Sequence, residues 1–451
     1  MSLAAWTPEQ VAAAAGARLA GPPPAGASGP SRAVIDSRAV AHGDLFFGLR
    51  GGQVDGGRFA PAALAAGAWG VVVAPEHAEA ARCAAPGVLL AAEDPTAALG
   101  RLARAHRRAL GCAVIGVTGS TGKTSTKEIL AAVLAPHRRT VAGRANFNTE
   151  IGVPLEILET GAGTEVLVLE LAMRGVGQIG ELAEICEPDV GVIVNVGPVH
   201  LELLGSLEAI AAAKSELTDA LAPGATAVVP ADEPLLAPHR RADLTTVTFG
   251  PGGDVTLARD AGDRVEVDAG GERMALEVSF RQSHQKRNLL AAVAAARAVG
   301  VSPAGRVDVR FSAGRGERIE LARGVVVIND CYNANPMSMR AALDELAAQP
   351  VAGRRIAVLG DMLELGPEEA RFHEEIGRHA ADRDVDVLVA VGPLAAAMVP
   401  PFGGSASAVP DADAAAALVA GLVRPGDTVL VKASRGVGLE VVAEALQGSV
   451  V

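Results

Sequence analysis

Residues 113–130, AVIGVTGSTGKTSTKEIL, carry the strongest structural signal in this chain. An apolar run typical of a buried parallel strand leads into a glycine-rich turn, and a helix-forming sequence follows. Gly119 and Gly122 can adopt backbone angles closed to other residues, so successive N–H groups can face a phosphate at the start of the helix. The stretch therefore predicts a strand, a phosphate-binding loop and a helix inside a parallel α/β domain.

The loop itself runs from Thr118 to Thr124 and predicts an ATP site. Lys123 supplies a positive charge for the β- and γ-phosphates, and Thr124 supplies a hydroxyl for Mg²⁺. The spacing is a T-G-x-x-G-K-T variant, because Val117 stands where the usual pattern has its first glycine. An ordinary glycine-rich turn is the alternative, but strand, glycines, lysine, threonine and helix in register favour ATP. The expected nucleotide contacts are Thr118, Gly119, Ser120, Thr121, Gly122, Lys123 and Thr124.

The pattern on either side of the loop predicts an α/β protein of three domains. Residues 166–171 and 190–196 resemble buried parallel strands separated by helices, which implies a doubly wound sheet. Residues 252–280 alternate as antiparallel strands do. We predict a small N-terminal α/β domain (1–94), a central P-loop ATPase domain with a doubly wound parallel sheet (95–311), and a C-terminal Rossmann-like α/β domain (312–451). The third rests on apolar runs at 325–329, 355–359, 385–391 and 428–431.

Composition excludes several classes of function. The chain has 451 residues, 49% of them hydrophobic, and a formal net charge of −12, which argues against nucleic acid or an anionic membrane as partner. No apolar stretch reaches the length of a membrane span, and the first residues lack a signal peptide pattern. The widely spaced cysteines are expected to be buried, reduced thiols. We expect a cytoplasmic protein.

Further segments resemble the Mur ligase family, whose members join amino acids or peptides to a UDP-linked muramic acid precursor. These segments are IDSRAV and GDLFFGLRG, NFNTEIGVP, VINDCYNANPMSM, VLGDMLELG and VKASRGVGLE, in family order along nearly the whole chain. VINDCYNANP and GDMLELG resemble the branch that adds D-alanyl-D-alanine to a UDP-MurNAc-tripeptide. Two positions depart from the family pattern: Thr149 and Gln285 stand where asparagine is usual.

The resemblance implies a reaction. ATP would phosphorylate the carboxylate of the UDP-MurNAc-tripeptide, and D-Ala-D-Ala would attack the acyl phosphate to give the pentapeptide, ADP and phosphate. The third residue of the tripeptide would be diaminopimelate or lysine, and the enzyme would be a monomer. The alternatives are a sister Mur enzyme or folylpolyglutamate synthetase, a P-loop kinase or simple NTPase, and a non-catalytic nucleotide-binding module.

The resemblance also implies a metal site. Glu170 ends an apolar strand at the carboxyl edge of the sheet, where it matches the family's metal-binding glutamate or, alternatively, is a surface acid. His200 matches a histidine serving a second metal, although a lone histidine after a strand is often structural. Lys214 lies on the apolar stripe of a helix capped by Ser206, with Leu207, Ile210, Leu217 and Leu221. It matches the lysine that Mur ligases carbamylate, and a snorkelling lysine is the alternative. Lys123, Lys214 and His200 are the expected catalytic residues.

Other residues carry family roles by position. The nucleotide contacts implied are Asn288 near the adenine, Arg315 near the phosphates with Arg318 as a rival, Asp330 on the ribose, and Asn333. The substrate contacts implied are Ser37, Arg38, Asn148, Asp361, Lys432, Ser434 and Arg435. Of these, Asp361, Lys432, Ser434 and Arg435 are as readily structural.

Overall fold

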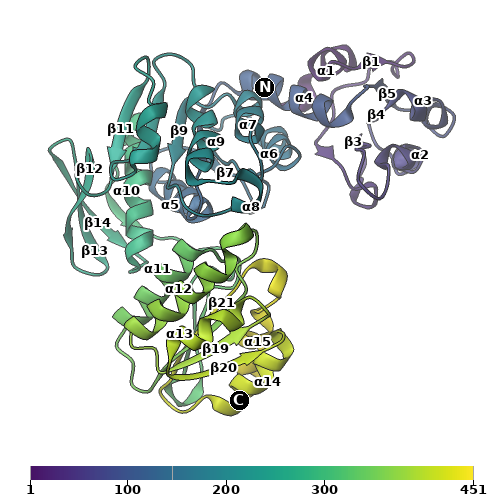
Figure 1. Ribbon diagram of the computed structural model, residues 1–451. Helices are drawn as coiled ribbons and strands as arrows, with labels where there is room; N and C mark the ends of the chain where they lie inside the picture. Colours follow the sequence, from purple (N-terminus) through teal and green to yellow (C-terminus); the bar gives the residue numbers. More distant parts are fainter. Residues whose placement is uncertain (1, 145, 450–451) are drawn as a thin grey trace.

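The computed structural model describes residues 2–144 and 146–449, which form three α/β units, each built on its own sheet (Figure 1). The N-terminal unit projects to one side of the central unit, and the C-terminal unit packs beneath it. The predicted three-domain α/β class is confirmed. The boundaries predicted near residues 94 and 311 fall between sheets, because the first sheet ends at Ala91, the second spans Ala113 to Val307 and the third begins at Glu317.

The N-terminal sheet is parallel except at one edge. Its order is β1-β5-β4-β3-β2, and β1 pairs antiparallel with β5. Phe46, Phe47 and Val72 are buried in it, as expected for strands covered on both faces. The elements are β1 (Arg18–Leu19), β2 (Ala33–Val34), β3 (Leu45–Phe47), β4 (Gly70–Val73), β5 (Val88–Ala91), α1 (Pro8–Ala15), α2 (Ala60–Ala65) and α3 (Pro75–Arg82).

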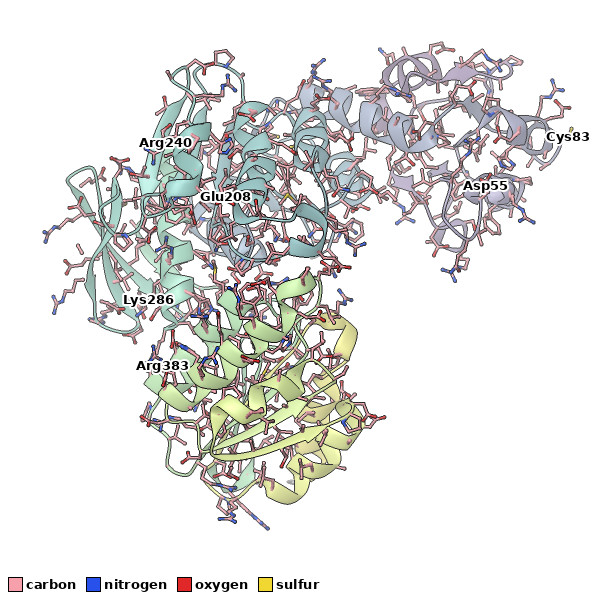
Figure 2. The ribbon with its side chains drawn as sticks, viewed as in Figure 1. Asp55, Cys83, Glu208, Arg240, Lys286 and Arg383 are labelled. Atoms are coloured by element: carbon pink, nitrogen blue, oxygen red, sulfur yellow. The ribbon has the colours of Figure 1, made fainter. Side chains whose placement is uncertain are left out.

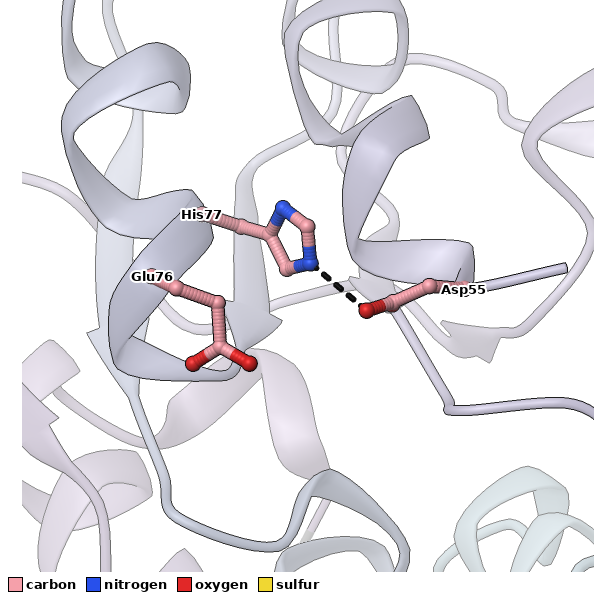
Figure 3. A group of neighbouring side chains, drawn as sticks. All are labelled: Asp55, Glu76 and His77. Atoms are coloured by element: carbon pink, nitrogen blue, oxygen red, sulfur yellow. Dashed lines mark hydrogen bonds and ion pairs between the residues drawn. The ribbon is translucent and has the colours of Figure 1, made fainter.

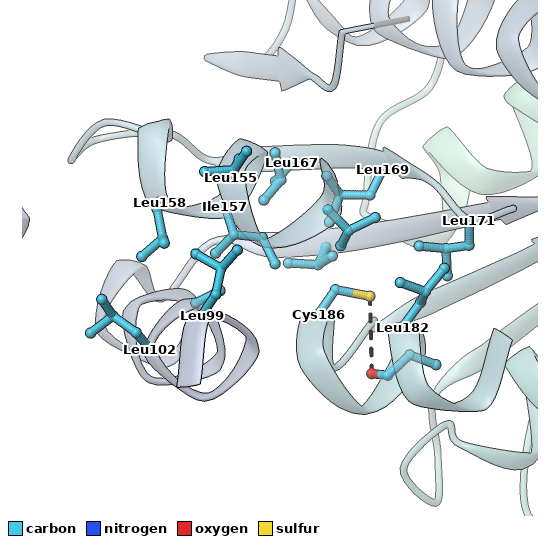
Figure 4. Packing of buried hydrophobic residues seen from close by; sticks show 14 of the residues in the cluster. Leu99, Leu102, Leu155, Ile157, Leu158, Leu167, Leu169, Leu171, Leu182 and Cys186 are labelled. Atoms are coloured by element: carbon cyan, nitrogen blue, oxygen red, sulfur yellow. Dashed lines mark hydrogen bonds between the residues drawn. The ribbon is translucent and has the colours of Figure 1, made fainter. Parts of the chain in front are cut away.

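Helix α4 (Pro95–Leu110) joins this unit to the central one. Asp94 caps it by accepting hydrogen bonds from the N–H groups of Thr96 and Ala97. Leu99 and Leu102 are fully buried in one continuous apolar cluster that includes core residues of both units (Figure 4). Because α4 packs against α1 on one side and α6 on the other, the N-terminal unit is attached through a stiff element.

The central sheet has the order β15-β14-β13-β12-β11-β10-β9-β6-β8-β7. The strands β6 to β11 are parallel, whereas β12, β13 and β14 form the antiparallel extension predicted for 252–280. Strand β6 lies between β8 and β9, where the strand order reverses, and its carboxyl end is the expected place for a ligand. The strands are β6 (Ala113–Thr118), β7 (Thr140–Ala142), β8 (Val166–Glu170), β9 (Val190–Ile193), β10 (Thr226–Pro230), β11 (Thr245–Phe249), β12 (Val255–Asp260), β13 (Arg264–Ala269), β14 (Glu272–Val278) and β15 (Gly305–Val307).

Helices cover both faces of this sheet. On one face α5 and α10 pack together, and Lys286 of α10 forms a 2.5 Å ion pair with Asp260 of β12 (Figure 2). The helices are α5 (Lys123–Leu134), α6 (Gly152–Glu159), α7 (Gln178–Cys186), α8 (Leu201–Leu204), α9 (Leu207–Asp219) and α10 (Ser283–Ala298).

The C-terminal sheet has the order β16-β17-β21-β18-β19-β20 and is parallel except for β16. This is the Rossmann-like arrangement that the sequence predicts. The elements are β16 (Glu317–Glu320), β17 (Val326–Asn329), β18 (Arg355–Gly360), β19 (Val387–Val391), β20 (Ser405–Val409), β21 (Thr428–Lys432), α11 (Pro336–Ala348), α12 (Glu369–Asp382), α13 (Val399–Phe402), α14 (Ala412–Leu422) and α15 (Glu440–Ser449).

Some sequence expectations need correction. Leu207 is 39% exposed rather than inward-facing, because it occupies the first position of α9 directly after the Ser206 cap. Cys83 is exposed, while Cys112, Cys186 and Cys331 are buried as free thiols. Burial raises the pKa of Cys186 to about 12. Within residues 2–144 and 146–449, no helix combines the length and hydropathy that a membrane span requires.

Candidate active site

The glycine-rich loop between β6 and α5 is held in place by the segment that follows β9. The N–H of Thr121 donates to Oδ1 of Asn195 at 2.9 Å, and the hydroxyl of Ser120 donates to the carbonyl of Gly197 at 2.9 Å. Gly122 has φ 75°, and a Cβ there would lie 2.9 Å from Nδ2 of Asn288. The position therefore requires glycine, and α5 begins directly after it with its N-terminus on the cleft.

Lys123 is the first residue of α5, directly after the loop. Its Nζ donates to the carbonyl of Gly119 at 2.7 Å. Burial lowers the pKa of its ammonium group, and the charge of Arg315 adds to this effect, while Glu170 opposes it. Among the described residues no carboxylate is bonded to either of these two cationic side chains, which is an arrangement suited to anionic phosphates.

Glu170 ends β8 beside the loop. Its Oε2 accepts a hydrogen bond from Oγ1 of Thr124 at 2.7 Å, and its Oε1 accepts one from Nδ2 of Asn148 at 2.8 Å. Burial opposes ionisation of Glu170, but the charge of Lys123 and these hydrogen bonds outweigh it, and the pKa is lowered. Thr124 and Glu170 thus bring two oxygen donors together, the atom type that Mg²⁺ prefers.

Lys214 lies behind this group on α9. It is only 2% exposed, and among the described residues its ammonium group has no hydrogen-bond or ion-pair partner. Burial lowers the pKa of Lys214 well below its usual value, and repulsion by Lys123 lowers it further.

His200 faces a residue of the C-terminal unit. Its Nδ1 is paired with Oε2 of Glu364, which follows β18, and both residues have positive φ angles, 54° and 64°. Burial lowers the pKa of His200, whereas Glu364 acts to raise it. When the ring is neutral, a carboxylate partner favours the proton on Nδ1, which leaves the lone pair on Nε2, as in metal-binding histidines.

The C-terminal unit supplies the opposite wall. Nζ of Lys432 donates to Oδ2 of Asp330 at 2.6 Å and to the carbonyl of Asn333 at 3.0 Å, which fixes the loop between β17 and α11. Arg315 approaches from the segment before β16, and its guanidinium carbon lies 3.8 Å from the ring centre of Tyr332. A cleft of about 990 Å³ separates the two units. The sequence-predicted residues that line it are Ser120, Thr121, Gly122, Lys123, Thr124, Asn148, Glu170, His200, Asn288, Arg315, Asp330, Asn333 and Lys432.

Lys214, described above, does not line this cleft, and neither do the other remaining predicted residues. Thr118 and Gly119 form the buried start of the loop, while Ser37 and Arg38 lie in the N-terminal unit, where Arg38 pairs with Asp36 at 2.8 Å. The other three line no part of the cleft either and have neighbours within the C-terminal unit. Asp361 accepts hydrogen bonds from the N–H groups of Leu394 and Ala395, Ser434 accepts one from Leu363, and Arg435 lies 5.5 Å from the Tyr332 ring centre.

Several residues of the site were not predicted from the sequence. Asn195, Glu364 and Tyr332 all make the contacts described above. Lys127 is another: it is 2% exposed, donates to the carbonyl of Gly143 at 2.5 Å and lies 4.0 Å from Glu170. A sequence signal existed for two of them, since Asn195 follows an apolar strand and Tyr332 is the single tyrosine of the chain.

A second group of polar side chains lies in the N-terminal unit and belongs to its fold (Figure 3). Nε2 of His77 lies 2.8 Å from Oδ2 of Asp55, whose other oxygen accepts a hydrogen bond from the N–H of Gly57. Glu76 pairs with Arg50. These contacts fix the glycine-rich turn after β3.

Comparison with known proteins matches this arrangement along the chain. Residues 33–107 match the model of the Mur ligase family catalytic domain, residues 117–296 the Mur ligase middle domain, and residues 314–435 the Mur ligase glutamate ligase domain. The UDP-N-acetylmuramoyl-tripeptide–D-alanyl-D-alanine ligase of Mycobacterium tuberculosis is 39% identical, over 91% of this chain and 91% of that protein. The chain belongs to the Mur ligase family. The resemblance predicted from the sequence is thereby confirmed.

Solved structures of Mur ligases agree. MurF from Acinetobacter baumannii superposes with a TM-score of 0.88 at 30% identity, covering 99% of this chain and 100% of that one. MurF from Thermotoga maritima, whose structure was solved with ADP, gives a TM-score of 0.82 at 32% identity, covering 93% and 97%. Like these Mur ligases, the chain is an ATP-binding ligase.

Proposed function

We propose that this Mur ligase joins D-alanyl-D-alanine to UDP-MurNAc-tripeptide, giving UDP-MurNAc-pentapeptide, ADP and phosphate. The tripeptide carboxylate attacks the γ-phosphorus of ATP and ADP leaves. The amine of the dipeptide then attacks the acyl carbon, loses a proton and expels phosphate. The observation that supports this reaction best is the cleft itself, whose central wall carries the phosphate loop and whose C-terminal wall carries Asp330 and Arg315.

The residues of the cleft fit a reaction that depends on alignment and charge rather than on a covalent nucleophile. Lys123 and Arg315 hold the transferring phosphoryl group from two sides. Asp330 accepts from the ribose hydroxyls, with Asn333 beside it and Lys432 holding its carboxylate in place, while Asn288 contacts the adenine. Thr149 and Gln285, which stand where the family usually has asparagine, also line the cleft. Oε1 of Gln285 is buried without a partner in the described part of the chain.

The donor atoms also fit Mg²⁺. Thr124 and Glu170 present oxygen atoms 2.7 Å apart next to the phosphate loop, and His200 leaves a ring nitrogen free. When bound there, Mg²⁺ neutralises charge on the phosphate oxygens. Lys214 would contribute a further oxygen ligand once it is carbamylated, and burial lowers the pKa of its ammonium group, which favours the neutral amine that reacts with CO₂.

The substrate contacts remain part of the proposal. Ser37 and Arg38 meet the UDP-sugar on the N-terminal unit. Asn148, Asp361, Lys432, Ser434 and Arg435 serve the peptide end, although Asp361 and Ser434 act there through the loops that they hold. The enzyme works as a cytoplasmic monomer.

A ligation assay tests the reaction. Purified protein receives UDP-MurNAc-tripeptide, ATP and Mg²⁺ together with D-Ala-D-Ala, or with single amino acids in parallel. We expect pentapeptide product and stoichiometric ADP only with the dipeptide. Ligation of a single amino acid instead would assign the chain to another branch of the family, and ATP hydrolysis at full rate without either substrate would make it a simple NTPase.

A further inference from the structure

Arg315 is a cation that the surrounding protein leaves unpaired. In residues 2–144 and 146–449 its guanidinium forms no ion pair and no hydrogen bond, and its Nε is buried without a partner. Its backbone offers little stiffness, because Gly314 and Gly316 flank it and both have φ 70°. A side chain on such a segment needs another element to define where its charge points.

Tyr332 is that element. The Arg315 guanidinium carbon lies 3.8 Å from the centre of the Tyr332 ring, which is close stacking for a cation on an aromatic face. The backbone N–H of Tyr332 donates to the carbonyl of Gly314 at 3.0 Å. Tyr332 therefore holds both the head of Arg315 and the residue preceding it.

Tyr332 is itself fixed from two sides. Lys432 bonds to Asp330 and to the carbonyl of Asn333, the residues that bracket Tyr332 in the chain. The phenol hydroxyl of Tyr332 donates to Oδ1 of Asn146, which belongs to the central unit. The ring is thus a rigid platform on the C-terminal wall with a tie to the central wall.

We propose that Tyr332 is a positioning residue for the ligation reaction, which orients the guanidinium of Arg315 toward the phosphates held at Lys123. This inference rests on the proposed role of Arg315 in the nucleotide site. Arg315 and Lys123 line the same cleft, so an oriented guanidinium is available to the transferring phosphoryl group. Without the ring, the glycine-flanked segment allows the guanidinium of Arg315 to adopt several orientations.

A double-mutant cycle tests the proposal, with kcat and KM for ATP measured in the ligation assay. We expect Arg315→Ala to lower kcat by about 10²- to 10³-fold, as for other preorganised transition-state donors. Tyr332→Leu should lower kcat about tenfold, which corresponds to the ~1–2 kcal/mol of a stacked cation. Since Tyr332 acts through Arg315, the double variant should be no slower than Arg315→Ala alone. Tyr332→Phe, which keeps the ring, should retain kcat within about threefold of the parent.

Controls separate this role from a merely structural one. On α12 the guanidinium carbon of Arg371 lies 5.0 Å from the centre of the Phe372 ring. Phe372→Leu removes this ring and should leave kcat unchanged. The affinity for a non-hydrolysable ATP analogue, measured by calorimetry, should weaken in Tyr332→Leu and not in Phe372→Leu. If the leucine variant unfolds, Tyr332→Met fills more of the space and replaces it.

Two results would overturn the inference. If Arg315→Ala is slow but the fold-decreases in kcat of the two single variants multiply in the double variant, Tyr332 acts independently of Arg315. Only the inference on Tyr332 is then wrong. If Arg315→Ala turns over at a near-normal rate, the proposed phosphate role of Arg315 is wrong as well.

Discussion

Replacing Lys214 separates a carbamylated metal ligand from a buried structural lysine, and the structure sets the size of the effects. Lys214 is 2% exposed, has no partner among the described residues, and has a pKa lowered by burial and by Lys123. An unpartnered buried polar group costs about 1–3 kcal/mol of folding free energy. In CO₂-free buffer Lys214→Met, which fills similar space, should therefore be more stable than the parent by about that amount. Each kcal/mol should raise the midpoint of thermal unfolding by about 2–4 °C.

Activity should change in the opposite direction. Lys214→Met and Lys214→Ala both remove an oxygen ligand, so each should lower kcat for ligation by about 10²-fold or more, the scale for losing one preorganised group in an active site. The two variants differ in the space that they leave. Alanine leaves a gap that acetate or formate can enter, whereas methionine occupies it, so added carboxylate should partly restore only the alanine variant.

The measurements are thermal unfolding, ligation rates with and without acetate, and the carbon-13 spectrum of protein equilibrated with labelled bicarbonate. The parent should show a carbamate resonance that both variants lack. The reasoning is refuted if Lys214→Met keeps normal turnover, if acetate activates both variants equally, or if the parent spectrum has no carbamate signal.

Three further perturbations concern the phosphate loop, a buried histidine of the C-terminal unit and the closure of the cleft. Lys123→Ala should lower ligation by about 10³-fold while the unfolding midpoint stays within a few degrees, because the half-buried side chain makes a single hydrogen bond to Gly119; a near-normal rate would remove the loop from the mechanism. His373 accepts a hydrogen bond from the N–H of Met362 and donates one to the carbonyl of Glu369, and burial lowers its pKa. Its contribution to the free energy of unfolding is therefore present above about pH 6.5 and is lost as the pH falls. In urea unfolding at pH 7.5 and 5.5, His373→Gln should reduce the loss of unfolding free energy at the lower pH, whereas His137→Gln, at an exposed position, should not. ATP together with the tripeptide should favour a closed arrangement of the central and C-terminal units, and X-ray scattering profiles identical with and without ligands would contradict this.

The parts of the site that could be predicted from the sequence are those encoded locally. The strand, loop and helix around Lys123 follow from adjacent residues, and Glu170 follows from its place at the end of an apolar strand. The carboxyl ends of parallel strands lie at one edge of a sheet. The 2.7 Å contact between Thr124 and Glu170 could therefore be predicted from the order of strands and loop alone.

The contacts that could not be predicted are those between distant segments. Asn195 bonds to Thr121 from 74 positions away, His200 pairs with Glu364 across 164 positions, and Tyr332 reaches Asn146 across 186. None of these pairs has a periodicity or spacing that links its members.

The charges of the cleft are the reason to expect that ATP binding and closure are coupled. The central unit brings Lys123 and the C-terminal unit brings Arg315, and neither cation has a carboxylate bonded to it in the described part of the chain. Phosphate groups at the loop would pair with cations from both walls at once. Each wall then gains its partner only when the two are close, so the same interaction free energy that binds the nucleotide favours the closed cleft. The pair formed by His200 and Glu364 supports the same conclusion, because it joins a proposed metal ligand on one wall to a carboxylate on the other. We therefore expect closure of the cleft to keep that histidine oriented.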